Sequence, residues 1–393
     1  MTPAGTQASG VGPEPQELPG GALPVETWSA DDAEAGPGSA RRAFPCRQCG
    51  AGMRWDPAAY ALTCSYCSSR LEVPRGEGTI VERPLEDAAT AERGLGLETR
   101  VARCSNCGAR VAWEGRETSK NCVYCGRATV LELESQRNAI QPESLIPLER
   151  GQSEVSTAFR AWRKRLWFRP SALQHVDHIA ATGIYVPFWT FDSNVFTRWS
   201  AEAGHYYYVN VQVRVRTGNG YRMETRRQQR VRWVPAWGTR HDSYDDLLVN
   251  ASEGLPEALV AELGGFDTTK LLPYRPEYLA GWAAEEYARD LDASWLNAQR
   301  RIEEIQRGRC SGDVPGDTQR NLQVQNAISD VRWKHVLLPI WSLQYRFRGK
   351  VYTVLVNGQT GKVVGQAPYS AVKIGALVLV IAALVLAFVF LKR

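Results

Sequence analysis

Cys46-Arg47-Gln48-Cys49 and Cys64-Ser65-Tyr66-Cys67 form a cysteine motif that the chain uses twice. The second copy, Cys104-Ser105-Asn106-Cys107 with Cys122-Val123-Tyr124-Cys125, lies 58 residues further on at every cysteine. In both copies, fourteen residues separate the two C-x-x-C pairs. This internal repeat predicts two small units of the same fold.

Each copy supplies the ligands of a structural zinc site. Such sites hold zinc in a tetrahedron of four soft ligands, and two C-x-x-C pairs joined by a short β-hairpin provide four thiolates. Gly50, Gly108 and Gly126 each follow a pair and permit the tight turn that points backbone N–H groups at sulfur, whereas Ser68 stands at the fourth such position. The sequence therefore predicts two structural Zn²⁺ ions that fold two four-cysteine ribbons, with redox or iron–sulfur sites as the alternatives. The predicted ligands are Cys46, Cys49, Cys64, Cys67, Cys104, Cys107, Cys122 and Cys125.

The composition of the whole chain is that of a globular protein. Of its 393 residues, 44% are hydrophobic and 23% are charged, which excludes a fully disordered chain and a collagen-like fibre. The net charge of +5 is too small to define a partner. The first 30 residues show no basic and apolar leader, so we expect reduced thiols that bind metal rather than disulfides.

One segment is apolar enough to span a bilayer. Residues 374–391 contain no polar side chain, and as a helix they would extend about 27 Å, close to the hydrocarbon thickness. Lys373 borders this run, and Tyr369 can lie at the membrane interface. A single span excludes a polytopic membrane protein. Because only two residues follow it, we expect a tail anchor with the bulk of the chain in the cytoplasm; a buried core helix is the alternative.

The region between the cysteine motifs and this anchor is predicted to be an α+β domain. Strand-rich stretches run over 184–237 and 336–365, and Val186–Thr190 resembles Leu338–Ser342, which lies 152 residues later. We therefore expect two related antiparallel β-units with helices between them. One helix face is predicted from Val155, Phe159, Trp162 and Leu166. The predicted organisation is a disordered tail (1–43), zinc ribbon 1 (44–75), a linker (76–100), zinc ribbon 2 (101–132), the α+β domain (145–370) and a transmembrane helix (374–391).

An arginine-rich hairpin is predicted around Gly218-Asn219-Gly220. A three-residue loop would place Val215 beside Met223 and keep apolar and basic side chains on opposite faces. The basic face would suit the phosphates of nucleic acid or of anionic lipid, unless the acids of residues 241–269 neutralise it. A second basic cluster, at 160–169, contains Trp162, Trp167 and Phe168. The arginines predicted to share the hairpin face as candidate anion-binding residues are Arg214, Arg216, Arg222, Arg226, Arg230 and Arg232.

No catalytic motif is recognisable. Gly358–Lys362 resembles part of a P-loop but lacks its first glycine and its Ser/Thr, and no nucleophile elbow, Rossmann fingerprint or zincin motif occurs. His175 and His178 lie near Asp177 without a further ligand, which favours a surface or core role. We expect a non-enzymatic protein, although a hydrolase or transferase acting at the membrane stays open.

The chain as a whole resembles a bacterial family of tandem zinc-ribbon proteins with a C-terminal membrane anchor and a poorly defined function. The resemblance covers roughly residues 44–393 and implies zinc and an anchor but no reaction. The ribbons alone are similar to the cysteine cluster of the primosomal replication helicase, yet this sequence lacks a Walker lysine motif and the acidic helicase box. Besides the cysteines, the matching marks are Trp167–Pro170, Tyr185–Thr190, Gly204–Tyr208, Pro273–Gly281, Leu338–Trp341 and Val356–Gly361.

Two functional hypotheses follow. In the first, the protein is a cytoplasm-facing membrane scaffold or adaptor, in which zinc ribbons recruit an unidentified protein partner and the α+β domain organises it. In the second, a membrane-held protein binds nucleic acid through ribbon 2 and the arginine-rich hairpin. No small-molecule substrate is inferred.

Overall fold

The structure is a computed structural model that describes residues 44–74, 78–95, 100–113, 122–126, 131–133, 139–171, 180–218 and 220–391. The predicted tail at 1–43 and the His175–His178 segment lie outside the described residues. The fold is α+β, as predicted. Its main sheet has twelve strands, and a separate three-stranded sheet, β1-β2-β3, carries the first cysteine motif.

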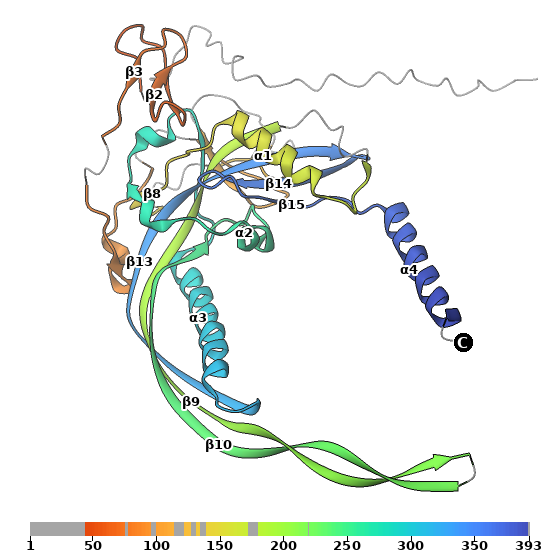
Figure 1. Ribbon diagram of the computed structural model, residues 1–393. Helices are drawn as coiled ribbons and strands as arrows, with labels where there is room; N and C mark the ends of the chain where they lie inside the picture. The colour runs from red at the N-terminus through yellow and green to blue at the C-terminus, as the bar shows by residue number, and fades with distance from the viewer. Residues whose placement is uncertain are drawn as a thin grey trace, which may run out of the picture.

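Three long antiparallel strands, β9 (Ala180–Thr217), β10 (Gly220–Asn250) and β13 (Thr318–Phe347), form the frame of the molecule (Figure 1). The other strands are β1 (Met53–Asp56), β2 (Ala61–Cys64), β3 (Arg70–Leu71), β4 (Arg83–Pro84), β5 (Arg100–Arg103), β6 (Arg110–Trp113), β7 (Leu131–Leu133), β8 (Ser144–Leu145), β11 (Leu272–Pro273), β12 (Ala283–Glu285), β14 (Lys350–Asn357) and β15 (Val363–Gly365). The helices are α1 (Gln152–Lys164), α2 (Glu257–Leu263), α3 (Leu291–Asp313) and α4 (Ala371–Leu391), with 3-10 turns at Leu85–Thr90, Thr268–Lys270 and Pro276–Leu279.

The faint internal repeat corresponds to two β-units that lie side by side. Val186 of β9 lies opposite Leu338 of β13, so the two strands that carry the similar segments pair in antiparallel register, and the segments meet at these two residues. Ile184 also pairs in parallel with Ala283 of β12, and Val336, 152 positions after Ile184, pairs in parallel with Ser144 of β8. Each unit is thus a short strand, a helix, a long strand and a hairpin partner. The prediction of two related β-units is confirmed.

The core forms where β9 and β13 are covered on both faces. Every residue from Gly183 to Phe191 of β9 is buried, which explains its continuous apolar sequence. Helix α1 packs Val155 and Phe159 into this core with Trp162 partly buried beside them, as predicted; Leu166 packs against the same core but lies beyond the end of the helix at Lys164.

The predicted hairpin register is wrong. Thr217 pairs with Gly220, so the loop has two residues, and Arg222 rather than Met223 lies opposite Val215. The physical reason is that β13 accompanies β9 only as far as Gly204. Beyond that point neither face of the hairpin is buried, so its apolar alternation does not specify the register, and the turn does. The second strand-rich stretch also begins earlier than expected, at Thr318, because its first half is polar and lacks an apolar signal.

Candidate metal centres and exposed surfaces

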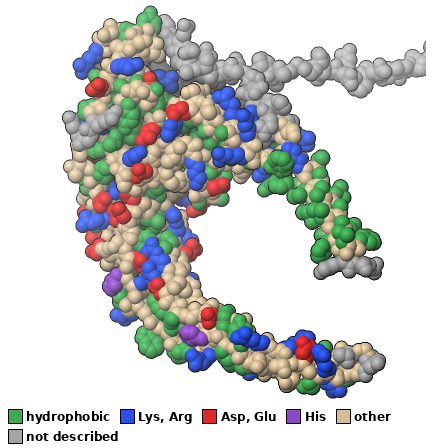
Figure 2. Space-filling model, in the orientation of Figure 1, with side chains coloured by type: hydrophobic (Ala, Val, Ile, Leu, Met, Phe, Trp, Pro, Cys, Tyr) green, Lys and Arg blue, Asp and Glu red, His purple; other side chains and the backbone are tan. Residues whose placement is uncertain are grey.

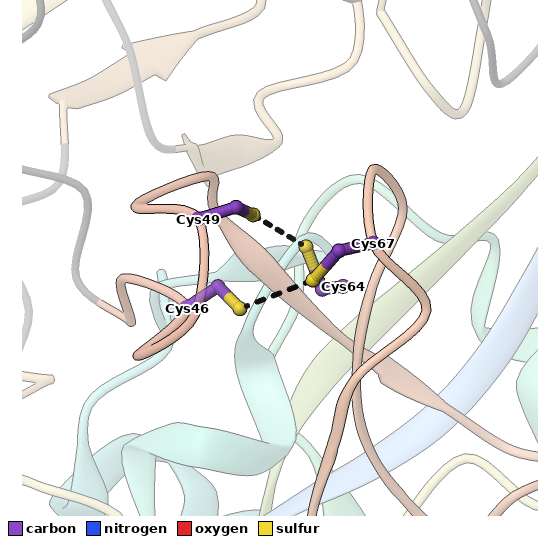
Figure 3. Close-up of side chains that lie close together, drawn as sticks. All are labelled: Cys46, Cys49, Cys64 and Cys67. Atoms are coloured by element: carbon purple, nitrogen blue, oxygen red, sulfur yellow. Dashed lines mark hydrogen bonds between the residues drawn. The ribbon is translucent and has the colours of Figure 1, made fainter.

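The first four-cysteine cluster has the geometry of a tetrahedral metal site. Cys46 Sγ lies 3.5 Å from Cys67 Sγ, and Cys49 Sγ lies 3.5 Å from Cys64 Sγ (Figure 3). All four sulfurs lie within 4.8 Å of one another. Four zinc–sulfur bonds of about 2.3 Å require neighbouring sulfurs to be about 3.8 Å apart, whereas a disulfide would require about 2 Å. The residues therefore fit a closed zinc site with four thiolate ligands.

Tight turns hold these cysteines in place. The N–H of Gly50 donates to the carbonyl of Cys46 at 2.8 Å, and the N–H of Ser68 donates to the carbonyl of Cys64 at 3.0 Å. Gly50 has a φ of 73° and Ser68 a φ of 59°. Ser68 thus adopts the same left-handed turn without being a glycine, so the position that departed from the sequence pattern keeps the pattern's geometry.

The second cluster is built in the same way. Cys104 and Cys125 have their sulfurs 3.6 Å apart, and Cys107 and Cys122 have theirs 3.5 Å apart. Gly108 and Gly126 close the two turns with φ values of 80° and 69°. The two clusters predicted from the sequence are therefore both assembled, and each can hold one metal ion.

The second centre is bonded directly to the main sheet. Strand β6 pairs with β12, and three successive carbonyls of the 122–125 turn accept side-chain hydrogen bonds from β13 and β14. These bonds are Gln344 Nε2 to Cys122 at 3.0 Å, Ser342 Oγ to Val123 at 2.5 Å and Thr353 Oγ1 to Tyr124 at 2.8 Å. Sequence reasoning missed these partners, which lie more than two hundred residues away along the chain.

A buried carboxylate adds a further connection. Glu285 of β12 is fully buried and accepts hydrogen bonds from Tyr124 Oη and Ser252 Oγ, both at 2.7 Å. Burial raises the pKa of Glu285 to about 7. By contrast Tyr66, which occupies the place of Tyr124 in the first motif, is 83% exposed. The first turn is open to solvent, and the second is part of the core.

Hydrogen bonds within each cluster shift the pKa values of the thiols in opposite directions. A hydrogen bond with the Ser69 hydroxyl, 2.9 Å from Cys46 Sγ, lowers the pKa of Cys46 to about 6. A hydrogen bond with Cys107 lowers the pKa of Cys122 to about 5. The pKa of Cys49 is raised to about 12, and the hydrogen bond with Cys122 raises the pKa of Cys107, so within each cluster a lowered thiol pKa is balanced by a raised one.

A third group of acids has a different role. Asp192, Asp245 and Asp246 come close enough to share an ion. The ammonium of Lys334, however, lies 2.7 Å from Asp246 and 2.8 Å from Glu82. Lys334 supplies the positive charge inside the protein, so this cluster is an ion-pair network.

The six arginines of the hairpin do not share one face. Arg222, Arg226, Arg230 and Arg232 lie on the face of Val209–Val215, whereas Arg214 and Arg216 lie on the opposite face. All six are exposed, and Arg226 pairs weakly with Glu224 at 3.5 Å. Within the described residues, no acid of 241–269 pairs with any of them; Asp242, for example, pairs with Arg240 and Arg309.

Helix α4 is long and apolar enough to cross a membrane, and none of its most apolar window is buried. Figure 2 shows it as an almost continuous hydrophobic surface that projects from the body.

Comparisons with known proteins give one relative and no fold match. The chain is 28% identical over 337 residues to the "Uncharacterized protein YdjG" of Bacillus subtilis (strain 168). This match covers 85% of the chain and 92% of that protein, so the similarity extends far beyond the cysteine motifs. No protein-family model and no solved structure matches.

Proposed function

We propose that this protein is a membrane-anchored, zinc-binding adaptor that binds a protein partner through the β9–β10 hairpin. The observation that carries the proposal is the shape of this hairpin. Residues 205–217 of β9 and 220–232 of β10 are here called the arm. Within the described part of the chain, these two segments form a β-ladder only with each other. At about 3.3 Å per residue the arm is about 40 Å long. Figure 1 shows it in the lower part of the picture, where it curves away from the rest of the protein.

An isolated two-stranded hairpin is marginally stable in water, so a long one needs a covering surface. Exposed aromatic and basic side chains lie on both faces of the arm. Tyr207 is 44% exposed on the face of Arg230, and Tyr208 is 52% exposed on the other face, under Arg227. Tyrosine and arginine are the residues that protein interfaces favour. The arm therefore offers the composition of a protein-binding surface.

In this proposal the metals have a structural role, and the protein acts by binding a partner. Four thiolates close each zinc site and leave no open position for a substrate or an activated water. The first centre adds a second candidate contact, because its turn presents the exposed Tyr66. The second centre, which is hydrogen-bonded to β13 and β14, fixes the geometry of the domain that carries the arm.

The anchor determines where in the cell the protein acts. Helix α4 inserts in the bilayer as a single span, with the bulk of the chain in the cytoplasm. The cysteines support this orientation, because eight metal-binding thiols require a reducing compartment.

A second candidate function is nucleic-acid binding at the membrane. The exposed arginines on both faces of the arm favour it, since phosphate contacts are made mainly by such side chains. The two functions differ in their ligand and can be separated in one experiment.

The test uses full-length, zinc-loaded protein. A photo-crosslinking residue is placed at Tyr207 or Tyr208, with Leu296 of α3, which is 58% exposed, as the control position. The adaptor proposal expects one discrete protein adduct from the arm in cells, none from Leu296, and loss of the adduct in an Arg226→Glu/Arg230→Glu variant.

Fluorescence anisotropy with labelled single- and double-stranded nucleic acids completes the test. Binding that persists near physiological salt, with a steep logarithmic salt dependence, would favour nucleic acid and overturn the protein adaptor. Absence of binding at low salt, where electrostatic attraction is strongest, removes the second candidate.

A further inference from the structure

The segment that follows α1 is fastened to the first turn of α4. The N–H of Ser370 donates to the carbonyl of Phe168 at 2.9 Å, and Lys373 Nζ donates to the carbonyl of Trp167 at 3.1 Å. The guanidinium of Arg169 stacks 3.6 Å from the ring centre of Tyr369 and donates to the carbonyl of Ala367. Any bilayer that receives α4 must therefore meet this segment at the same depth.

The side chains of this segment are unusual for a soluble surface. Trp167 is 79% exposed, Phe168 is 41% exposed and Tyr369 is 69% exposed. Their neighbours Trp162 and Leu166 pack against the core, so the exposure is specific to the residues beside α4. Tryptophan and tyrosine are enriched at membrane–water interfaces, where the ring contacts hydrocarbon and the polar atom contacts water.

Exposed basic side chains lie on the elements next to these aromatic residues. Lys164 and Arg165, at the end of α1, are exposed, and so are Arg346, Arg348 and Lys350 at the β13–β14 turn. The chain between β15 and α4 runs beside β14 toward that turn, as the 3.3 Å hydrogen bond from the N–H of Gln366 to the carbonyl of Thr353 indicates. Figure 2 shows Lys and Arg side chains gathered beside the base of α4.

Among the residues that the structure describes, these charges have no acidic partner. None of the five basic residues forms an ion pair with another described residue. The sequence contains no Asp or Glu from Val155 to Val176, and none from Val331 to Arg393. A positive surface of this kind attracts the anionic headgroups of a membrane.

We propose that Trp167, Phe168 and Tyr369, with Lys164, Arg165 and Arg348, form an interfacial collar that binds anionic phospholipid around α4. The aromatic rings enter the headgroup layer, and the basic side chains bind lipid phosphates. The collar rests on the proposed membrane insertion of α4, and it adds a lipid preference.

The test uses the full chain in lipid nanodiscs that contain phosphatidylcholine and about one-third phosphatidylglycerol, a composition at which polybasic surfaces bind. Lipids brominated near the headgroup quench tryptophan at the interface, and α4 itself contains no tryptophan. We expect the brominated lipids to quench part of the tryptophan fluorescence, and we expect this quenching to disappear in Trp167→Phe. The matched control is Trp237→Phe, because Trp237 is 77% exposed but lies on β10 away from α4.

The preference for anionic lipid is tested by changing the charge of the lipid and of the protein. Brominated phosphatidylglycerol should quench more strongly than brominated phosphatidylcholine. In Lys164→Glu/Arg165→Glu we expect the enrichment of anionic lipid to fall about fivefold or more, since one basic residue near an anionic surface contributes about that factor. Arg222→Glu/Arg226→Glu on the arm should leave the enrichment unchanged.

Flotation with alkaline-washed vesicles measures insertion of α4 separately. The collar is overturned, and the anchor is left intact, if the protein floats but its Trp167 fluorescence is not quenched. The same conclusion follows if the protein floats and both lipids quench equally. Protein that does not float overturns the anchor and the collar with it.

Discussion

Tyr124 donates a 2.7 Å hydrogen bond to Glu285, and this bond joins the second metal-binding turn to strand β12. Tyr124 is only 3% exposed, whereas its counterpart in the first repeat, Tyr66, is 83% exposed. Two motifs of identical cysteine spacing therefore serve different purposes. The second stabilises the sheet from which the arm extends, and the first presents its turn to solvent.

Removal of the Tyr124 hydroxyl tests this difference. In Tyr124→Phe, Glu285 keeps its bond from Ser252 but loses one partner in a buried environment. We expect the free energy of unfolding to fall by about 1–3 kcal/mol. A competing zinc chelator should also strip the second centre faster than in the wild-type protein, because the turn that carries Cys122 and Cys125 is loosened.

Tyr66→Phe is the matched control, since it removes the same hydroxyl from an exposed site. Its free energy of unfolding should change by less than about 0.5 kcal/mol. Equal effects of the two variants, measured by urea unfolding and by zinc release, would contradict the assignment of a core role to the second turn.

The sequence predicted those parts of the molecule that depend on local pattern. The cysteine ligands, the buried face of α1 and the apolar helix α4 all follow from spacing within one segment. The hairpin register could not be predicted, because Val209–Val215 alternate with polar residues but no third strand covers them. The roles of Glu285 and Lys334 could not be predicted either. Their hydrogen-bond partners are distant in the sequence, and only the burial of the two side chains in the folded protein reveals their importance.

Loss of one metal should affect the two centres unequally. Cys49→Ser and Cys107→Ser each remove one ligand of one site, and each variant should retain one zinc ion by elemental analysis. The 122–125 turn accepts three hydrogen bonds from β13 and β14, so its disorder should cost about 3 kcal/mol of global stability at about 1 kcal/mol for each bond. Thermal unfolding should therefore show a clearly lower Tm for Cys107→Ser than for Cys49→Ser. A larger decrease in Tm for Cys49→Ser would contradict the conclusion that the second centre contributes more to the stability of the sheet.

Lys334 should be indispensable for folding stability. It is 5% exposed and forms ion pairs with Asp246 and Glu82, while burial raises the pKa of the adjacent Asp192 to about 6. Lys334→Met leaves buried negative charge uncompensated, and we expect a loss of about 3–5 kcal/mol in denaturant unfolding. Addition of Asp246→Asn should recover part of this loss, and Lys270→Met, at an exposed site, should be nearly neutral. Strictly additive effects of the Lys334 and Asp246 substitutions would show that the two side chains do not interact.

His335 should make the protein less stable in mild acid. Its ring is fully buried, Nδ1 donates to the carbonyl of Ile140 at 2.9 Å, and burial lowers its pKa to about 4. In the unfolded chain the pKa is about 6.5, so below that pH the unfolded state binds a proton that the folded state refuses. The stability contributed by neutral His335 is therefore present above pH 6.5 and is lost as the pH falls toward 4.

The measurement compares wild-type protein with His335→Asn at pH 7.5 and pH 5.5. The substituted asparagine does not titrate, so the difference in free energy of unfolding between the two proteins should shift by about 1.4 kcal/mol against the wild type at pH 5.5. Subtraction removes the contributions of Glu285, Asp192 and the cysteines, which titrate equally in both proteins. Parallel stability curves across this pH range would mean that the pKa of His335 is the same in the folded and unfolded states, and the burial argument would then be wrong.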